Sequence, residues 1–466
     1  MKLAKNIILN VDSYKTSMFK QYPVGTTGVY SYIESRGGRY DRTVFFGLQA
    51  FIKEYLLDPI TQSDIDIADE ILTAHGEPFN RTGWQYILDK HRGYLPVVIR
   101  AVPEGTVVPV KNVLATIENT DPECFWLTTW LETALLRAVW YGTTVATQSY
   151  TIKQVILDYL ERTGDPTTID FKLHDFGARG VSSMESAGIG GAAHLVNFMG
   201  TDTITGILYA REFYRAGIAG FSIPAMEHST VTSWGRAGEV DAYRNMLNQY
   251  AKSGAVLAVV SDSYDIYNAA EKLWGEELRQ QVIDSGATVV IRPDSGDPVE
   301  VNMKLIEILG QKFGYTTNTK GFKVLNNVRL IQGDGVNELT IRSILGALMA
   351  MGWSADNIAF GMGGALLQQV DRDTQQFAMK CSAVEIGSGN WIDVVKDPIT
   401  DPGKKSKAGC VSLWKSGGEW SSAVDQPKGW FDKGVGPFEQ MLETVFLDGK
   451  LIRDYTFEEV RANARK

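Results

Sequence analysis

The chain has 466 residues, of which 44% are hydrophobic and 22% are charged, and its formal net charge is −9. A chain of this length is too long to form one small hydrophobic core, so we expect about two or three structural parts. The negative charge argues against a general nucleic-acid-binding protein, which normally has a basic excess. It leaves room for local basic pockets that bind phosphate.

Three cysteines, Cys124, Cys381 and Cys410, lie far apart and form no CxxC motif. This usage favours a reduced, intracellular setting. The apolar run in the N-terminal MKLAKNIILNVDSYK is too short for the core of a signal peptide. No apolar stretch approaches the ~20 residues of a membrane helix. We therefore expect a soluble, cytoplasmic protein that binds neither membrane nor nucleic acid.

Residues 1–150 mix aromatic strand-like pieces, GVYSYIE and TVFFGL, with helical ones, LQAFIKEYLL and FWLTTWLETALLRAVW. Residues 96–116 have the pattern of antiparallel strands, with turns at PEG and near VPVKN. We expect this region to form an N-terminal α+β part.

Residues 151–375 repeat one rhythm, in which an apolar or β-branched run precedes a polar or glycine-rich cluster and then a helical stretch. This rhythm predicts βαβ units and a parallel sheet, and the number of units favours an irregular parallel α/β barrel over an open sheet. The clusters are HDFGARG, MEHS, SDSYD, RPDSG, QGDG and GMGG. Because the carboxyl ends of barrel strands lie on one face, we expect these clusters to converge there.

From residue 376 the pattern is β-like again, with FAMKCSAVEI and NWIDVV before a Lys-rich loop, DPGKKSKAG. We expect residues 376–466 to pack with residues 1–150. The predicted fold class is therefore α/β, with an additional α+β part that the N- and C-terminal regions build together.

Three glycine-rich segments invite a functional interpretation. GDG (333–335) and GMGG (361–364) each precede a helix, where free N–H groups bind phosphate, although a tight turn is the alternative for each. GIGGAA (188–193) matches a variant of the dinucleotide-binding motif. No strand directly precedes it and no acidic residue closes a second strand about 20 residues on, so we predict helix packing instead.

Two of the five histidines, His174 and His228, follow predicted strands, whereas His75, His91 and His194 have a structural or exposed setting. No pair has the spacing of a zinc motif. Asp262 and Asp265 follow the next strand after His228, and a carboxylate there could orient its imidazole. The alternative is a hydrogen-bonded core histidine.

No G-x-S-x-G elbow, Walker A loop or protein-kinase signature is present, so nucleophilic hydrolysis by Ser or Cys is not expected. Asp202, in GTDT, is another candidate for a functional site, although it could instead simply cap the N-terminus of a helix.

Motifs along nearly the whole chain resemble those of the nicotinamide phosphoribosyltransferase family, a type II phosphoribosyltransferase family. The motifs are DSYK (12–15), KQYP (20–23), FFGLQ (45–49), HDFGARG (174–180), GTDT (200–203), EHST (227–230), SDSYDIYNA (261–269), IRPDSG (291–296), QGDG (332–335), IAFG (358–361) and KDP (396–398). The resemblance implies transfer of the phosphoribosyl group of phosphoribosyl pyrophosphate to nicotinamide, in NAD salvage. Nicotinate phosphoribosyltransferase is the nearest alternative, and a hydride-transfer enzyme or a non-enzymatic binding protein are alternatives of other classes.

The resemblance also assigns roles to residues. Phe176 would stack on one face of the pyridine ring, and Tyr14 of a second subunit on the other, so the enzyme would be a homodimer with shared sites. Asp202 would accept from the amide of nicotinamide and repel the carboxylate of nicotinic acid. Arg292 and Asp294 would contact substrate and ribose.

His228 resembles the histidine that ATP phosphorylates in this family, so ATP is expected as a co-substrate, with Asp262 and Glu227 as candidates to orient the imidazole. Mg²⁺ would screen the pyrophosphate, with ligands that stay unknown. Ala178 and Ala365 depart from the family pattern and leave the pocket shape open. The catalytic candidates are His228, Asp294, Asp262 and Arg292. The substrate-binding candidates are Phe176, Tyr14, Asp202, Arg179, Asp12, Ser222, Arg36, Arg372, Lys380, Lys404, Gly333, Asp334, Gly363 and Gly364.

Overall fold

A computed structural model describes residues 5–387, 389–400, 405–425, 434 and 436–466 of the chain. The chain forms two compact units. The first comprises Met1–Thr147, Ala210–Ala216 and Val370–Lys466, and the second Gln148–Tyr209 and Gly217–Gln369. The division differs in detail from the predicted parts 1–150, 151–375 and 376–466, whose boundaries stay a prediction. It also assigns residues 210–216 to the first unit.

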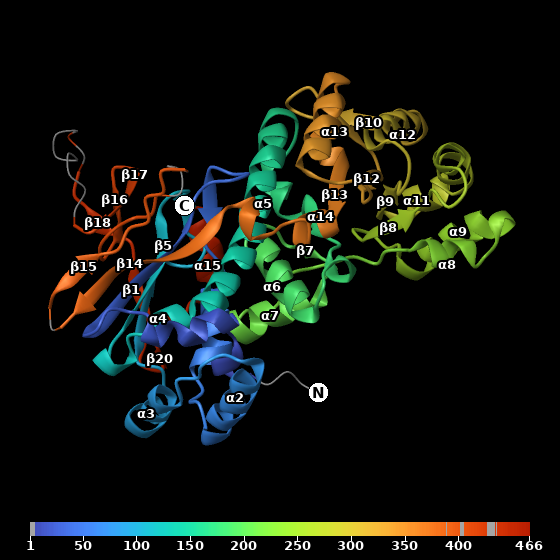
Figure 1. The fold of residues 1–466 in the computed structure, drawn as a ribbon. Coiled ribbons are helices and arrows are strands. Elements are labelled where there is room, and N and C mark those ends of the chain that lie inside the picture. The colour runs from blue at the N-terminus through green and yellow to red at the C-terminus, as the bar shows by residue number, and fades with distance from the viewer. Residues whose placement is uncertain (1–4, 388, 401–404, 426–433, 435) are drawn as a thin grey trace. The chain divides into compact units, whose positions relative to one another are not determined.

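The first unit contains a seven-stranded antiparallel sheet that interleaves N- and C-terminal strands (Figure 1). Its order is β15 (Trp391–Asp393), β14 (Phe377–Ile386), β1 (Thr26–Ser35), β5 (Val113–Asn119), β3 (Val97–Ala101), β19 (Glu443–Leu447) and β20 (Lys450–Leu451). The long strands β1 and β14 pair from Ser35 with Phe377 to Thr26 with Ile386. The predicted α+β part built from both ends of the chain is thus confirmed.

Short strands and helices complete the first unit. The strands are β2 (Arg42–Val44), β4 (Val107–Pro109), β16 (Ser412–Ser416), β17 (Glu419–Ala423) and β18 (Glu439–Gln440). The helices are α1 (Leu48–Phe51), α2 (Gln62–His75), α3 (Arg81–His91), α4 (Leu127–Trp130), the first half of α5 (Glu132–Thr163), and α15 (Phe457–Ala464). Three indoles, Trp84, Trp126 and Trp130, meet edge to face in its core, with ring centroids 5.0–5.5 Å apart.

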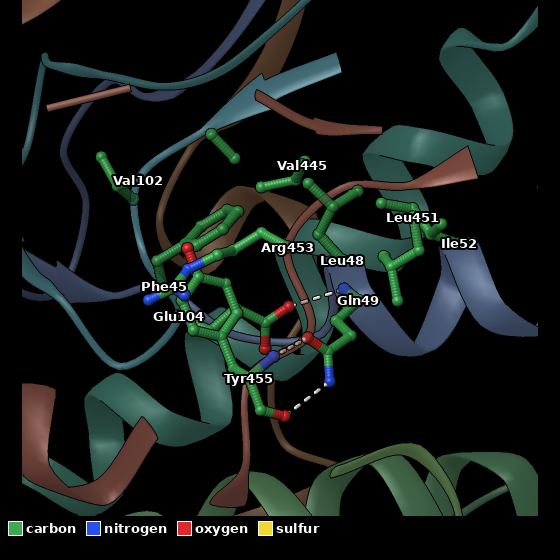
Figure 2. A pocket seen from close by; sticks show the side chains of 11 residues that line it. Phe45, Leu48, Gln49, Ile52, Val102, Glu104, Val445, Leu451, Arg453 and Tyr455 are labelled. Atoms are coloured by element: carbon green, nitrogen blue, oxygen red, sulfur yellow. Dashed lines mark hydrogen bonds between the residues drawn. The ribbon is translucent and has the colours of Figure 1, made fainter. Parts of the chain in front are cut away.

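Gln49, in the FFGLQ motif, ties the N-terminal region of this unit to its C-terminal segment. Its side chain exchanges two hydrogen bonds with the backbone of Tyr455, at 2.7 and 2.9 Å (Figure 2). Nearby, the buried carboxylate of Glu104 accepts from the N–H groups of Gly47 and Gln49 and from the hydroxyl of Tyr214. The small pocket that these side chains line is therefore a structural joint, and the motif has a folding role.

The second unit is built on a six-stranded parallel sheet. Its order is β7 (Gly200–Thr201), β6 (Leu173–Asp175), β13 (Ile358–Met362), β12 (Val328–Gln332), β9 (Thr288–Arg292) and β8 (Val256–Val260). Strands β8, β9 and β12 are rich in Val, Ile and Leu, as is usual for a parallel sheet with both faces covered.

A single segment, residues 221–226, closes this sheet into an irregular barrel. Phe221 forms a parallel bridge with Gly200 in β7, and Ala225 forms one with Ala258 in β8. The N–H of Ala258 donates to the carbonyl of Pro224 at 2.9 Å. The segment therefore touches both edge strands, and the predicted irregular parallel α/β barrel is confirmed.

Helices follow the strands, as the sequence rhythm predicted. They are the second half of α5, α6 (Met184–Leu195), the beginning of α7 (Ile204–Tyr214), α8 (His228–Thr232), α9 (Glu239–Tyr250), α10 (Ile266–Asn268), α11 (Arg279–Ser285), α12 (Pro298–Phe313), α13 (Glu338–Ala350) and α14 (Gly364–Leu367). A hairpin of β10 (Tyr315–Thr317) and β11 (Lys323–Leu325) precedes β12. Asp297 caps α12 by accepting from the N–H groups of Val299 and Glu300, with Pro298 as first residue. Such caps start helices directly after the loops that carry the polar clusters.

The glycines of GIGGAA lie in α6 and pack against α7. A Cβ atom at Gly206 would lie 2.8 Å from backbone atoms of Gly191, so the two helices touch through their backbones. The predicted helix-packing role is confirmed. Among the helices that the structure describes, none is both long enough and apolar enough to cross a membrane.

Candidate active site

Polar side chains at the carboxyl ends of neighbouring strands contact one another in the second unit. A hydrogen bond joins Asp202, after β7, to His174 in β6. Another joins the backbone N–H of Asp294, after β9, to Asp262, after β8. The clusters that follow the strands therefore meet at one face of the barrel, as the strand pattern predicted.

His228 begins α8 directly after the closing segment, and Asp262 holds its imidazole. Nε2 of His228 lies 2.9 Å from Oδ1 of Asp262, and Nδ1 lies 3.9 Å from Oδ2 of Asp294. Oδ2 of Asp262 accepts from the hydroxyl of Ser295 at 2.6 Å and from the N–H of Asp294 at 3.1 Å. Burial raises the pKa of Asp262, but hydrogen bonds from Ser295, His228 and Asp294 outweigh it, so this pKa lies below its ordinary value. Asp262 is thus a charged acceptor that orients the imidazole.

Arg292 ends β9 and Asp294 follows it. Nη2 of Arg292 donates to Oδ2 of Asp294 at 3.4 Å, while its Nε is buried without a partner. Oδ1 of Asp294 has no hydrogen-bond donor among the described residues, and a Cβ at Gly333 would lie 3.2 Å from it. The carboxylate of the exposed Asp334 beside Gly333 is also without a donor in the described chain. This corner combines an unpaired N–H with open carboxylate oxygens, so it suits a ligand with hydroxyl and anionic groups.

Asp202 directs one carboxylate oxygen into the protein and leaves the other open. Oδ1 accepts from Nε2 of His174 at 3.2 Å and from the hydroxyl of Ser222 at 2.6 Å. The side chain is 49% exposed. Burial raises the pKa of Asp202, but hydrogen bonds from His174 and Ser222 outweigh it, so this pKa lies below the ordinary value. The group is a charged acceptor and does not cap a helix.

The ring of Phe176, directly after β6, lies against glycines of the neighbouring strand ends. A Cβ atom at Gly361 would lie 1.9 Å from its Cε2, and one at Gly333 would lie 3.4 Å from it. The ring also packs on a small apolar cluster formed by Ala258, Val290 and Ile331. Glycine at 361 therefore makes room for an aromatic wall in the site.

Gly363 and Gly364 lie at the start of α14, beside the turn that carries Arg179. A Cβ at Gly180 would lie 3.3 Å from Cα of Gly364, so turn and loop are neighbours. Arg179 is exposed and makes no hydrogen bond or ion pair with the described residues. An unpaired guanidinium beside a glycine loop is able to bind a phosphate.

In the first unit, β1 and β14 bring basic side chains together. Burial lowers the pKa of Lys380, Glu132 opposes this, and the neighbouring Arg36 and Lys15 lower it further. Nε of Arg36 donates to Glu34 at 3.3 Å, but its Nη2 is buried without a partner. This cluster, with an unused N–H, suits an anionic ligand.

The other candidates of the first unit have simpler surroundings. Asp12 accepts from a threonine hydroxyl of α5 at 2.8 Å. Tyr14 is 59% exposed. Arg372 is exposed and lies 3.0 Å from the carboxylate of the next residue. Lys404 lies outside the described residues.

Sequence reasoning missed several members of the site. Ser295, in the RPDSG cluster, supports Asp262, and Gly361 accommodates Phe176. His174 was predicted to follow a strand, but it lies within β6, and its contact with Asp202 was not predicted. Glu227, a candidate to orient His228, instead accepts from the hydroxyl of its neighbour Ser229.

One group of possible metal ligands occurs in the described part of the chain, in the first unit. Ligand atoms of His91, Asp121 and Cys124 lie within 4.8 Å of one another. Asp121 already accepts from His91, from the hydroxyl of Tyr86 and from the N–H of Glu123. The nitrogen of His91 and the sulfur of Cys124 do not match Mg²⁺, which prefers oxygen ligands. The hydrogen bonds to Asp121 account for the closeness of His91 and Asp121.

Two family models match the chain. The nicotinate phosphoribosyltransferase family matches residues 171–450, and the N-terminal domain of nicotinamide phosphoribosyltransferase matches residues 6–99. The nicotinamide phosphoribosyltransferase of Xanthomonas campestris pv. campestris is 57% identical over 100% of this chain and 99% of its own. That of Acinetobacter baylyi is 32% identical over 99% of this chain and 97% of its own.

Solved structures support the fold. The nicotinate-nucleotide pyrophosphorylase of Pyrococcus furiosus has a TM-score of 0.65 at 15% identity, over 100% of this chain and 97% of its own. The human nicotinic acid phosphoribosyltransferase has a TM-score of 0.58 at 14% identity, over 97% and 92%.

Proposed function

Because the chain belongs to the nicotinate phosphoribosyltransferase family, we propose that it transfers the phosphoribosyl group of phosphoribosyl pyrophosphate to nicotinamide. The products are nicotinamide mononucleotide and pyrophosphate, and the reaction serves NAD salvage. Nicotinic acid, the base used by relatives in the same family, is the disfavoured alternative.

Oδ2 of Asp202, which has no donor in the described chain, is proposed to determine which base the enzyme accepts. Oδ1 of the same carboxylate is occupied by two donors, and the low pKa keeps the group charged. An amide N–H₂ can donate to Oδ2, whereas the carboxylate of nicotinic acid would bring a second negative charge to the same place. This one observation favours nicotinamide.

Phe176 offers a ring face for stacking on the pyridine. The opposite face would be covered by Tyr14 of a second subunit, in a homodimer with shared sites. The 59% exposure of Tyr14 supports this, because the ring is free to enter a partner's site. Large apolar side chains exposed on the second unit are a further sign of a partner surface. They include Phe171, Met184, Ile204, Leu208, Ile218 and Phe221, of which Phe171 and Phe221 contact each other.

The reaction is a displacement at the anomeric carbon of the ribose. The bond from this carbon to the pyrophosphate oxygen breaks, and a bond to the pyridine nitrogen forms, through a state with positive charge on the ribose. The carboxylate of Asp294 can stabilise that charge, and Arg292 can bind the substrate through its unpaired Nε. Orientation and electrostatics supply the catalysis, and no side-chain nucleophile is required.

The anionic groups of the substrate need cations. In the second unit, Arg179 is proposed to bind a phosphate, with Gly363 and Gly364 exposing backbone N–H groups. In the first unit, Arg36, Lys380 and Arg372 are proposed to bind anionic groups. Asp12 would help to place Tyr14.

Mg²⁺ usually binds one or two carboxylates together with substrate phosphates. Oδ1 of Asp294 and the carboxylate of Asp334 fit this need, because neither has a donor among the residues described. These residues would hold Mg²⁺, which would screen the charge of the leaving pyrophosphate.

His228 is proposed to accept a phosphoryl group from ATP. Asp262 binds Nε2, which keeps the proton there and leaves the lone pair on Nδ1. Attack of Nδ1 on the γ-phosphorus breaks the bond to ADP and gives phosphohistidine. Water then releases phosphate from the histidine as the ribosyl transfer is completed, which couples ATP hydrolysis to product formation.

The test supplies phosphoribosyl pyrophosphate, Mg²⁺ and nicotinamide, with and without ATP, and measures nicotinamide mononucleotide and pyrophosphate. Arg292→Ala and Asp294→Asn should each lower the rate by about 100-fold. His75→Ala, at an exposed histidine far along the chain from the site motifs, is the control and should leave the rate unchanged. No mononucleotide from folded protein, with or without ATP, would overturn the proposal.

A further inference from the structure

Both donors to the carboxylate of Asp202 bind the same oxygen, Oδ1, and no described residue donates to Oδ2. Nε2 of His174 and the hydroxyl of Ser222 converge on Oδ1, while Oδ2 has no donor in the described chain. His174 is only 14% exposed at its side chain, whereas Asp202 is 49% exposed. A largely buried imidazole therefore holds Oδ1, and Oδ2 is left for a donor from outside the described chain.

The strand register explains how His174 reaches Asp202. His174 in β6 pairs with Gly200 in β7, in parallel register. A Cβ atom at Gly200 would lie 2.6 Å from Nδ1 of His174, so the imidazole lies across the backbone of β7. Asp202 is two residues farther on and so on the same face. Glycine at 200 is thus a condition for the contact between the histidine and the aspartate.

The end of β7 is itself held in place. The N–H of Asp202 donates to the carbonyl of Asp175 at 2.9 Å. The carbonyl of Gly200 lies 3.2 Å from Nε2 of the fully buried His194, whose Nδ1 lies 3.0 Å from the hydroxyl of Ser149. The backbone under Asp202 is therefore fixed, and the remaining freedom is the rotation of its carboxylate.

His174 also contacts the aromatic wall of the site. Its ring centroid lies 5.5 Å from that of Phe176, with the planes at 55°. One imidazole therefore touches both the proposed amide acceptor and the proposed stacking ring, and links their positions.

From these contacts we infer that His174 is a positioning residue that determines the preference for the amide over the acid. By donating to Oδ1 it stops the carboxylate from rotating, so that Oδ2 and its charge face the position of the substrate's amide group. The inference rests on the proposed function, because it concerns the choice between two bases in the same reaction. Without the imidazole, Ser222 alone holds Asp202, and a rotated carboxylate binds the amide less well.

The experiment compares His174→Leu, which removes the donor, with His174→Gln, whose amide can donate from nearly the same place. For each variant, kcat and KM are measured separately with nicotinamide and with nicotinic acid. His174→Leu should raise the KM for nicotinamide by ~10-fold, with a smaller effect on kcat, because a hydrogen bond to a charged group is lost. The ratio of kcat/KM for nicotinamide to that for nicotinic acid should fall by a similar factor. His174→Gln should keep the ratio within ~3-fold of the original.

His75→Leu and His75→Gln are the matched controls at an exposed histidine and should change neither ratio nor KM. A His174→Leu protein that keeps its ratio of kcat/KM, or loses both activities equally, would overturn the inference, since a merely structural role predicts that result. If this variant fails to fold, Gly200→Ala carries the same prediction, because the added Cβ displaces the imidazole. Failure of the unmodified enzyme to make either mononucleotide would instead count against the proposed function.

Discussion

At the level of single residues, two carboxylates of the site stay charged because donors hold them in place. The carboxylate of Asp202 accepts hydrogen bonds from His174 and Ser222. That of Asp262 accepts from Ser295, from His228 and from the backbone N–H of Asp294. In both cases hydrogen bonds outweigh burial and lower the pKa. Each group can therefore act by its charge at neutral pH, one toward the base and one toward His228.

Asp202→Asn removes the charge and keeps the shape. The repulsion of the nicotinic acid carboxylate is then lost, so kcat/KM for nicotinic acid should rise relative to that for nicotinamide by ~10- to 100-fold. Steady-state kinetics with both bases measure the change. An unchanged ratio would show that selectivity arises elsewhere.

Asp262→Asn should abolish ATP-dependent stimulation, because the orienting charge at Nε2 of His228 is gone. The depressed pKa of Asp262 means that the carboxylate stays charged until the pH falls below its ordinary range. The loss in the variant should therefore be the same at every pH from about 5 to 8. Labelling with γ-phosphate-labelled ATP checks this, with His228→Asn as the negative reference. Full labelling of the Asp262→Asn protein would contradict the assigned role.

Part of this residue-level description follows from the sequence alone. The position of Asp262 after the strand that follows His228 suggested an orienting carboxylate, and the hydrogen bond is present. The contact between His174 and Asp202 was missed because it depends on the register of β6 against β7 and on the absence of a side chain at Gly200. Neither is visible in local spacing.

At the level of elements, strand-to-helix rhythm located most of the barrel. The runs in AVLAVV, ATVVIR, VRLIQ and NIAFG became β8, β9, β12 and β13. The run in GIAGFSIPAMEHS forms only two bridges, because Pro224 has no N–H to donate to a sheet. β7 has two residues, too few for any periodic signal.

The contact of α6 with α7 gives a stability test. Gly206→Ala would bring a Cβ to 2.8 Å from backbone atoms of Gly191, which cannot move away as a flexible side chain could. Overpacking of this kind should cost about 1–3 kcal/mol of unfolding free energy. Gly217→Ala is the matched control, since a Cβ there meets nothing within 4 Å. Denaturant unfolding of both variants measures the difference, and equal stabilities would contradict the close packing.

At the level of the whole molecule, both ends of the chain build one sheet, and the barrel residues form a separate compact unit. The strand-to-helix rhythm occurs only in the middle of the chain, and this made an α/β barrel with an α+β part from both ends predictable, while the exact boundaries stay predictions. The pairing of β1 with β14 joins residues more than 340 positions apart, and only the tertiary fold sets its register.

The proposed homodimer predicts complementation between inactive proteins. A Tyr14→Ala protein is mixed with an Asp202→Ala protein under conditions that allow subunit exchange. If Tyr14 enters the partner's site, each mixed dimer has one site with both lesions and one with neither, so activity should recover. No recovery despite demonstrated exchange would contradict the shared site.

One competition between the two bases directly measures whether this enzyme selects the amide. The protein receives phosphoribosyl pyrophosphate and Mg²⁺ with equal concentrations of nicotinamide and nicotinic acid, and both mononucleotides are quantified. A large excess of nicotinamide mononucleotide is the predicted result. Mostly nicotinic acid mononucleotide would keep the fold and the reaction but contradict the role of Asp202.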